Sequence, residues 1–164
     1  VKELLRLSRG SLELFDAVQK KLIKALRSNS QIQARVELLT SIAGIGEITA
    51  LTWVLEVGDP GRFSNSRQAI SYCGLCSAQQ ESAGKERRGP ISKQRNKHLQ
   101  TKLIEAAKLA PYWNPQLATL HEKELIRGNR NRAARAVARK LVEYLLAVDR
   151  RGTPYVTQEP EQVA

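Results

Sequence analysis

The segment from Leu38 to Gly58 constrains the fold of this chain more than any other part of its sequence. Its apolar residues recur at the spacing of an amphipathic helix on both sides of a glycine pair: Leu39, Ile42, Ile45, Ile48, Leu51 and Leu55. Glycine allows positive φ and lets a phosphate come close to the backbone N–H groups that open the following helix. We therefore predict a helix-hairpin-helix over residues 38–57, with Gly44 and Gly46 as nucleic-acid-binding positions. A helix–turn–helix corner without any ligand is the alternative.

The rest of the sequence also predicts helices. Residues 2–28 carry apolar side chains at heptad-like positions, which is typical of a coiled-coil arm, although a pair of core helices fits equally well. Aromatic residues make up only 5% of the chain, and long alternating Val/Ile/Thr runs are missing, which argues against an all-β domain. We predict an all-α fold: a helical, coiled-coil-like arm at residues 1–36, a compact helical domain at 37–149 and a flexible tail at 150–164.

The positive charge of the chain is concentrated in one part of it. The net charge is +11, of which +1 falls in residues 1–60 and +10 in residues 61–164. Such a concentration favours a polyanionic partner, most simply nucleic acid, bound mainly through its phosphates. Part of this charge lies in a basic run from Arg127 to Lys140. No segment approaches the roughly 18 uninterrupted apolar residues of a membrane span, so we expect no membrane partner.

The segment after Tyr72 combines a serine with many cations. A polar loop is predicted from Leu75 to Pro90, and it contains Ser82. A hydroxyl facing cations is what attack on a phosphodiester requires, because the cations stabilise the charge of the phosphorane. An ordinary phosphate-binding loop has the same composition, and from the residues alone it is the favoured alternative. Ser92 is expected to cap a helix that starts at Lys93. The candidate phosphate-binding cations are Lys85, Arg87, Arg88, Lys93, Arg95 and Lys97.

The cysteines and histidines predict no metal centre. Cys73 and Cys76 form one C-x-x-C, but a structural zinc site needs four ligands and no second pair follows. His98 and His121 are isolated in the sequence, and neither belongs to a Ser-His-Asp pattern. We expect both cysteines to be small buried residues near the end of a helix in a reducing cytoplasm.

Three blocks of the sequence together resemble the C-terminal transposase domain of the insertion sequence 110 family. They are LTSIAGIGEITA, GDPGRFSNSRQAISYCGL and SAGKERRGPISKQRNKHLQTKLIEAA, and their order and spacing match over residues 38–107. The resemblance implies a DNA recombinase with an N-terminal RuvC-like domain, a coiled-coil segment and this C-terminal domain. By motif position it makes Ser82 the catalytic nucleophile, which forms a covalent serine–DNA intermediate. Ala83, Arg95 and Gln100 depart from the family's usual residues.

The resemblance also implies partners and a missing half of the active site. Full-length members bind Mg²⁺ through four acidic residues of the RuvC-like domain, so no cofactor is expected in this fragment. They act with a bridge RNA that pairs with target and donor DNA, and they assemble as dimers or tetramers. The chain lacks Met and starts at Val1, so we expect a piece of a longer bacterial protein, cytoplasmic and nucleoid-associated. Such a piece should bind nucleic acid but be inactive alone. A non-catalytic helix-hairpin-helix module that binds DNA or RNA remains the alternative.

Overall fold

Helix α1 (Lys2–Arg27) carries its apolar side chains on the outside. None of its residues is buried, and its leucines from Leu4 to Leu22, with Phe15 and Val18, are 55–71% exposed. After a break at Asn29, whose side chain accepts hydrogen bonds from the backbone N–H groups of Gln31 and Ile32, α2 (Ser30–Thr40) begins. An amphipathic helix needs a partner to bury its apolar face. The coiled-coil arm stays a prediction.

The computed structural model describes residues 1–82, 85–91 and 95–156, and the chain divides into two compact units, residues 1–34 and 35–164. The second unit contains the core. Its elements after α2 are α3 (Glu47–Val57), η1 (Pro60–Arg62), α4 (Ser66–Tyr72), β1 (Ser77–Ser82), β2 (Lys85–Ile91), α5 (Lys97–Leu109), η2 (Ala110–Tyr112), α6 (Pro115–Ile126) and α7 (Arg130–Arg151).

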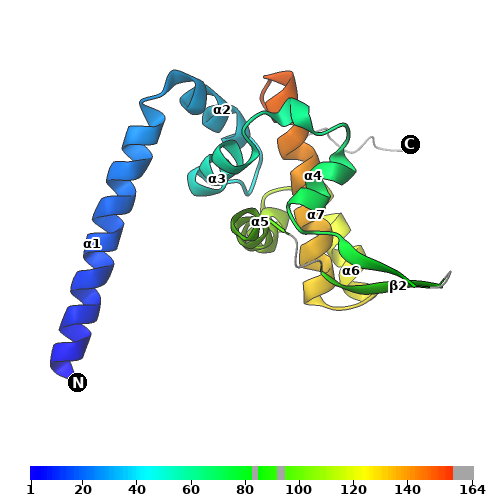
Figure 1. The fold of residues 1–164 in the computed structure, drawn as a ribbon, viewed down its shortest axis with the longest axis horizontal. Coiled ribbons are helices and arrows are strands. Elements are labelled where there is room, and N and C mark those ends of the chain that lie inside the picture. Colours follow the sequence, from blue (N-terminus) through cyan, green and yellow to red (C-terminus); the bar gives the residue numbers. More distant parts are fainter. Residues whose placement is uncertain (83–84, 92–94, 157–164) are drawn as a thin grey trace. The chain divides into compact units, whose positions relative to one another are not determined.

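Helix α7 lies at the centre of the second unit and packs against α4, α5, α6 and η1 (Figure 1). Its buried face is built from Ala, Val and Leu at helical spacing, which allows neighbouring helices to approach closely. The carboxylate of Asp149, near the end of α7, accepts two hydrogen bonds from Arg35 at 2.7 and 2.8 Å and one from Trp53 Nε1 at 2.9 Å. This cluster ties α2 and α3 to α7.

Asparagine side chains mark where four helices of the second unit begin. Asn65, Asn96, Asn114 and Asn129 each accept a hydrogen bond from a backbone N–H in the first turn of α4, α5, α6 and α7. Such caps satisfy donors that the helix itself leaves unpaired. Helix α5 therefore begins at Lys97, four residues later than the sequence suggested from Ser92.

The predicted all-α fold class is confirmed, since helices form the core of the described chain. The difference lies in the segment predicted to be a loop. There the structure has an antiparallel hairpin of β1 and β2, which extends outward from the helices of the second unit (Figure 1). Its strands pair with each other and lack the apolar alternation that signals a strand in the sequence. No described helix is long and apolar enough to cross a membrane.

Candidate nucleic-acid interface

The hairpin places Ser82 at the last pair of its ladder. Ser82 pairs with Lys85, and Arg87 and Arg88 pair with Gln80 and Gln79. Directly opposed residues of an antiparallel pair have Cα atoms about 4.5–5.5 Å apart. The register therefore brings the backbone of the predicted nucleophile beside one predicted phosphate-binding residue, with two more within the next three positions of β2. Lys93 and Ala83 lie outside the described residues.

Both ends of the hairpin are fixed to the helical core by backbone carbonyl groups. On the side that enters β1, Gln100 Nε2 donates to the Gly74 carbonyl at 2.6 Å, and Arg139 Nε donates to the Leu75 carbonyl at 2.9 Å. On the side that leaves β2, the Asn96 N–H donates to the Tyr72 carbonyl at 3.2 Å. The buried core thus sets where the hairpin starts and ends.

The two ends of the hairpin also touch each other at Gly74. Its φ is +69°, and a Cβ built there would stand 2.4 Å from the Cβ of Arg95. Only glycine fits this close approach. Arg95, one of the predicted phosphate-binding residues, is therefore half-buried at the base of the hairpin and is not one of its outer cations. Lys97, in contrast, is exposed in the first turn of α5.

A polar network connects this base to α3. Tyr72 donates its hydroxyl proton to the Glu56 carbonyl oxygen at 2.8 Å, and Asn96 Nδ2 donates to the Glu56 carboxylate at 2.5 Å. The Arg62 guanidinium lies over the Tyr72 ring, 4.3 Å from its centroid, where the ring quadrupole attracts a cation. Residues from α3, α4 and the start of α5 are therefore held together immediately beside the hairpin.

The two glycines of the predicted helix-hairpin-helix have different surroundings. Gly44 has φ of +91°, and a Cβ there would lie 2.5 Å from the Cβ of Ala110, so this turn packs directly on η2. Gly46 precedes α3 as its N-cap residue, and no heavy atom of the described chain stands within 4 Å of a Cβ built on it. Between them Ile45 is buried. The open position at Gly46 is the one that a phosphate could approach. The helix-hairpin-helix itself stays a prediction.

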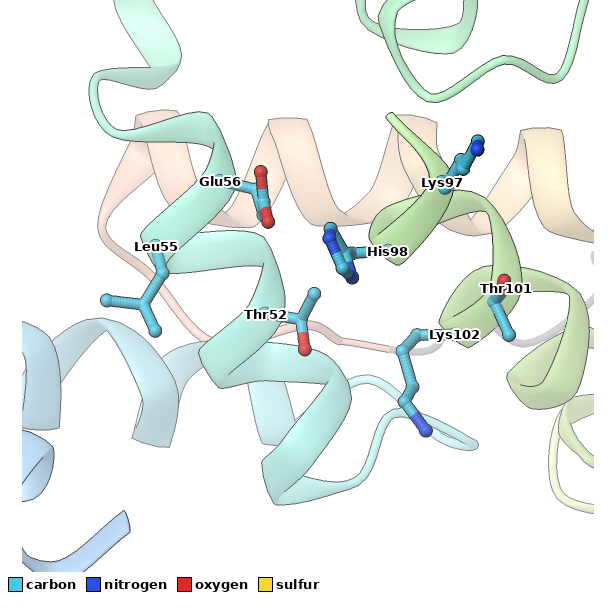
Figure 2. A pocket seen from close by; sticks show the side chains of 7 residues that line it. All are labelled: Thr52, Leu55, Glu56, Lys97, His98, Thr101 and Lys102. Atoms are coloured by element: carbon cyan, nitrogen blue, oxygen red, sulfur yellow. The ribbon is translucent and has the colours of Figure 1, made fainter. Parts of the chain in front are cut away.

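A groove between α3 and α5 adjoins the hairpin base. Its volume is about 380 Å³. Figure 2 shows His98 reaching from α5 toward α3, where Thr52 and Glu56 form the facing wall. The charge pattern of the sequence identified Lys97 but not His98 or Thr101, although spacings of three and four residues place all these side chains on one face of α5. The groove is lined by Thr52, Leu55, Glu56, Lys97, His98, Thr101 and Lys102.

Four cations of the basic run from Arg127 to Lys140 make contacts within the domain. Glu124 accepts from Arg132 Nε at 2.7 Å and lies 3.8 Å from Arg127, and the hydrogen bond from Arg132 lowers the pKa of this carboxyl group. Lys140 pairs with Glu143 at 2.8 Å. Two carboxylates thus offset part of the positive charge of this run, while Arg139, bonded to the neutral Leu75 carbonyl, keeps its charge.

Of the two cysteines, Cys73 is buried and Cys76 is half-buried. Burial raises the pKa of the Cys73 thiol from 9.0 to about 12, an effect that outweighs the nearby Arg62 charge. A buried, protonated thiol is neither a good nucleophile nor a metal ligand. Across the described ranges, no group of three His, Cys, Asp or Glu residues could hold a metal ion.

Fold and site together define a helical domain with a serine-containing, cation-rich hairpin fixed to its core. The model of the transposase IS116/IS110/IS902 family matches residues 36–122. A probable family 20 transposase of Pseudomonas aeruginosa is 32% identical over 106 residues, which is 65% of this chain and 31% of that protein. The transposase for insertion sequence element IS1328 of Yersinia enterocolitica is 29% identical over 136 residues, or 80% of this chain and 41% of the relative.

A third relative, the transposase for insertion sequence element IS1111A of Coxiella burnetii, is 38% identical over 86 residues, or 52% of this chain and 23% of the relative. The chain belongs to the IS116/IS110/IS902 transposase family, which confirms the resemblance found in the sequence. It spans less than half the length of each of these relatives.

Proposed function

We propose that this chain is the DNA-binding C-terminal part of a transposase and supplies Ser82 as the nucleophile for DNA strand cleavage and exchange. The observation that carries the proposal is the hairpin register, which pairs Ser82 with Lys85 in a member of a transposase family. The fixed ends of the hairpin support it, because a nucleophile must be held in position relative to its substrate.

In the proposed reaction, the Ser82 oxygen attacks a scissile phosphorus atom. A serine–phosphate bond forms, the bond to a sugar oxygen breaks, the serine loses its proton and the departing sugar oxygen gains one. Lys85, Arg87 and Arg88 stabilise the negative charge that builds up on the phosphate oxygens. Attack by a hydroxyl of another strand reverses the step and joins the new partner. Because one phosphodiester replaces another, strand exchange needs no external energy source.

In this proposal, the described residues of the chain do not bind Mg²⁺. The described part of the chain offers no carboxylate cluster that fits this ion, which prefers oxygen ligands in octahedral geometry. None of the steps above therefore uses the metal. We expect Mg²⁺ on a RuvC-like domain outside this chain, so that the 164-residue chain alone binds DNA without cleaving it.

The proposed DNA surface has three parts: the hairpin cations, the groove between α3 and α5, and the open backbone at Gly46. All three would contact phosphates, so binding should depend on salt and only weakly on sequence. The proposed partners are DNA, a bridge RNA and further copies of the protein assembled through the exposed apolar face of α1. A DNA substrate would place the protein in the bacterial cytoplasm beside the nucleoid.

The second candidate function is a binding module without catalysis. It is favoured by the groove and Gly46, since these lie on the helical core and would hold a phosphate backbone without the hairpin. Both candidates predict DNA binding by the isolated chain, and they differ only in what happens at Ser82.

An assay of strand exchange by the full-length protein with its guide RNA distinguishes the two candidate functions. Ser82→Ala should reduce exchange by at least about 10³-fold, as expected for loss of a nucleophile, while DNA affinity stays within about twofold. Ser77→Ala, at the other end of β1, is the matched control and should retain activity. If Ser82→Ala exchanges strands as fast as this control, Ser82 is not the nucleophile and only the binding module remains as the function of this chain.

A further inference from the structure

Two large aromatic side chains are exposed just after α5. Tyr112, the last residue of η2, is 80% exposed, and Trp113, which follows it, is 73% exposed. Rings of this size normally bury roughly 150–250 Å² each and dominate cores and interfaces. Two exposed neighbours therefore indicate a binding surface more than a packing defect.

The backbone that carries these rings is held firmly. Ala110, at the start of η2, is fully buried, and Gly44 packs against it. The N–H groups of Trp113 and Asn114 both donate to the Ala110 carbonyl at 3.1 Å. The buried Asn114 side chain then caps α6. Because the segment is ordered before any partner binds, little conformational entropy would be lost when a ligand stacks on the rings.

A cavity of about 680 Å³ adjoins Tyr112. Lys108 and Arg130 supply positive charge in its lining, while His121 and Asn131 supply groups that can form hydrogen bonds. The one acidic residue in the lining is Glu122. Ligand pockets of roughly 300–1,000 Å³ hold drug-sized molecules, so one nucleotide fits. A flat aromatic surface, hydrogen-bonding groups and cations match the base face, the base edge and the phosphate of such a ligand.

Building on the proposed nucleic-acid function, we propose that Tyr112, Trp113 and this cavity form a stacking site for unpaired nucleotides of a single strand. In a duplex the base faces are covered by neighbouring pairs, whereas an unpaired strand exposes them to aromatic side chains. The net charge of +10 in residues 61–164 would attract either kind of strand. The exposed rings add a preference for the unpaired one.

Tryptophan fluorescence tests the site directly. The chain has two tryptophans, and Trp53 is fully buried with its Nε1 bonded to Asp149, so a change on binding reports Trp113. Titration of the 164-residue chain with an oligothymidylate should quench this fluorescence and protect Trp113 from iodide. A DNA duplex of the same length should bind without this quenching.

Substitutions give the energetic test. Loss of one stacked base should weaken oligothymidylate binding by about 5-fold to 150-fold, so we expect a change in this range for Trp113→Ala and for Tyr112→Ala. Trp113→Phe should keep most of the affinity and lose the signal. Duplex affinity should stay unchanged in all three variants. Since both rings are exposed, the thermal unfolding midpoint should stay within about 2 °C of the wild type, which checks that each variant is folded.

Each other outcome has a definite meaning. Unchanged oligothymidylate affinity in both alanine variants, or equal quenching by the duplex, overturns the stacking site but leaves the proposed DNA-binding function intact if the duplex binds. Failure of both nucleic acids to bind overturns both proposals. Self-association that Trp113→Ala abolishes, with no effect of this change on oligothymidylate binding, would identify a protein interface and overturn the stacking site.

Discussion

Gly44 and Gly46 show how the same residue type takes different roles two positions apart. The sequence predicts both from one pattern, because both allow a tight turn and a close phosphate. What separates them is Ala110, which is far along the chain and packs against Gly44 only in the folded domain. Neighbours of this kind cannot be predicted from local spacing.

The first prediction compares the two glycines. Gly44→Ala should lower the free energy of unfolding by about 2–4 kcal/mol, because an added Cβ meets both a strained positive φ and the Ala110 side chain. Gly46→Ala should change it by less than about 1 kcal/mol, since the position is open and its φ is −85°. Urea denaturation measures both values. Equal destabilisation by the two changes would contradict the packing role of Gly44.

The second prediction concerns the Cys73 thiol. Burial raises its pKa from 9.0 to about 12, so the folded state holds this proton more tightly than the unfolded chain. The resulting stabilisation is complete below about pH 9 and is lost as the pH rises toward about 12. The difference in unfolding free energy between the wild type and Cys73→Ala should therefore shrink above about pH 9. A difference that stays constant up to about pH 11 would contradict this.

At the scale of elements, helix existence was easier to predict than helix ends or the hairpin. Periodicity identified the helices of the second unit because each buries one face, and it identified α1 by an apolar face that stays exposed. The sequence predicts that α5 starts at Lys93 after a Ser92 cap, because serine and asparagine are both good caps. The contacts of Asn96 with Tyr72 and Glu56, which come from distant segments, accompany the true start at Lys97. The sequence predicts a loop where the structure has the hairpin, because these residues carry no apolar alternation. The role of Ser82 as nucleophile comes from its family motif and stays a prediction.

The third prediction tests the groove between α3 and α5. Lys97→Glu should weaken binding of duplex DNA at low salt by about 10-fold and reduce the slope of log affinity against log salt by about 1. Lys123→Glu, on the exposed surface of α6, makes the same change of charge outside the groove and serves as the control. If both variants lose the same affinity, total charge and not the groove determines binding.

At the scale of the whole molecule, the sequence predicted a positive half but not how its charges are distributed. Arg127, Arg132 and Lys140 form ion pairs with Glu124 and Glu143. The pair of Arg132 with Glu124 depends on which helix faces come together, whereas the other two pairs join residues three positions apart. A count of cations alone therefore overestimates the cationic surface. The hairpin and the groove are therefore better candidates for DNA contact than the basic run of α7.

The fourth prediction concerns assembly through α1. The apolar heptad-like positions of α1 are Leu5, Leu12, Phe15, Leu22 and Leu26. Leu12→Glu places a charge at one of them and should shift the protein from dimers or tetramers to monomers in sedimentation experiments, because a coiled-coil seam excludes charge. Leu14→Glu is the matched control, since Leu14 is similarly exposed, at 67% against 63%, but lies off the heptad positions. Identical sedimentation of the two variants would contradict the predicted coiled coil.

The central claim is that Ser82 becomes covalently attached to DNA, and its most direct test is to locate that bond. Full-length protein with its guide RNA is trapped on a nicked DNA substrate, then digested with nuclease and trypsin. We predict that the tryptic peptide of residues 68–85 carries the nucleotide, and that fragmentation in the mass spectrometer assigns the bond to Ser82. A nucleotide on Ser71 or Ser77 of that peptide, or on any other peptide, would contradict the account.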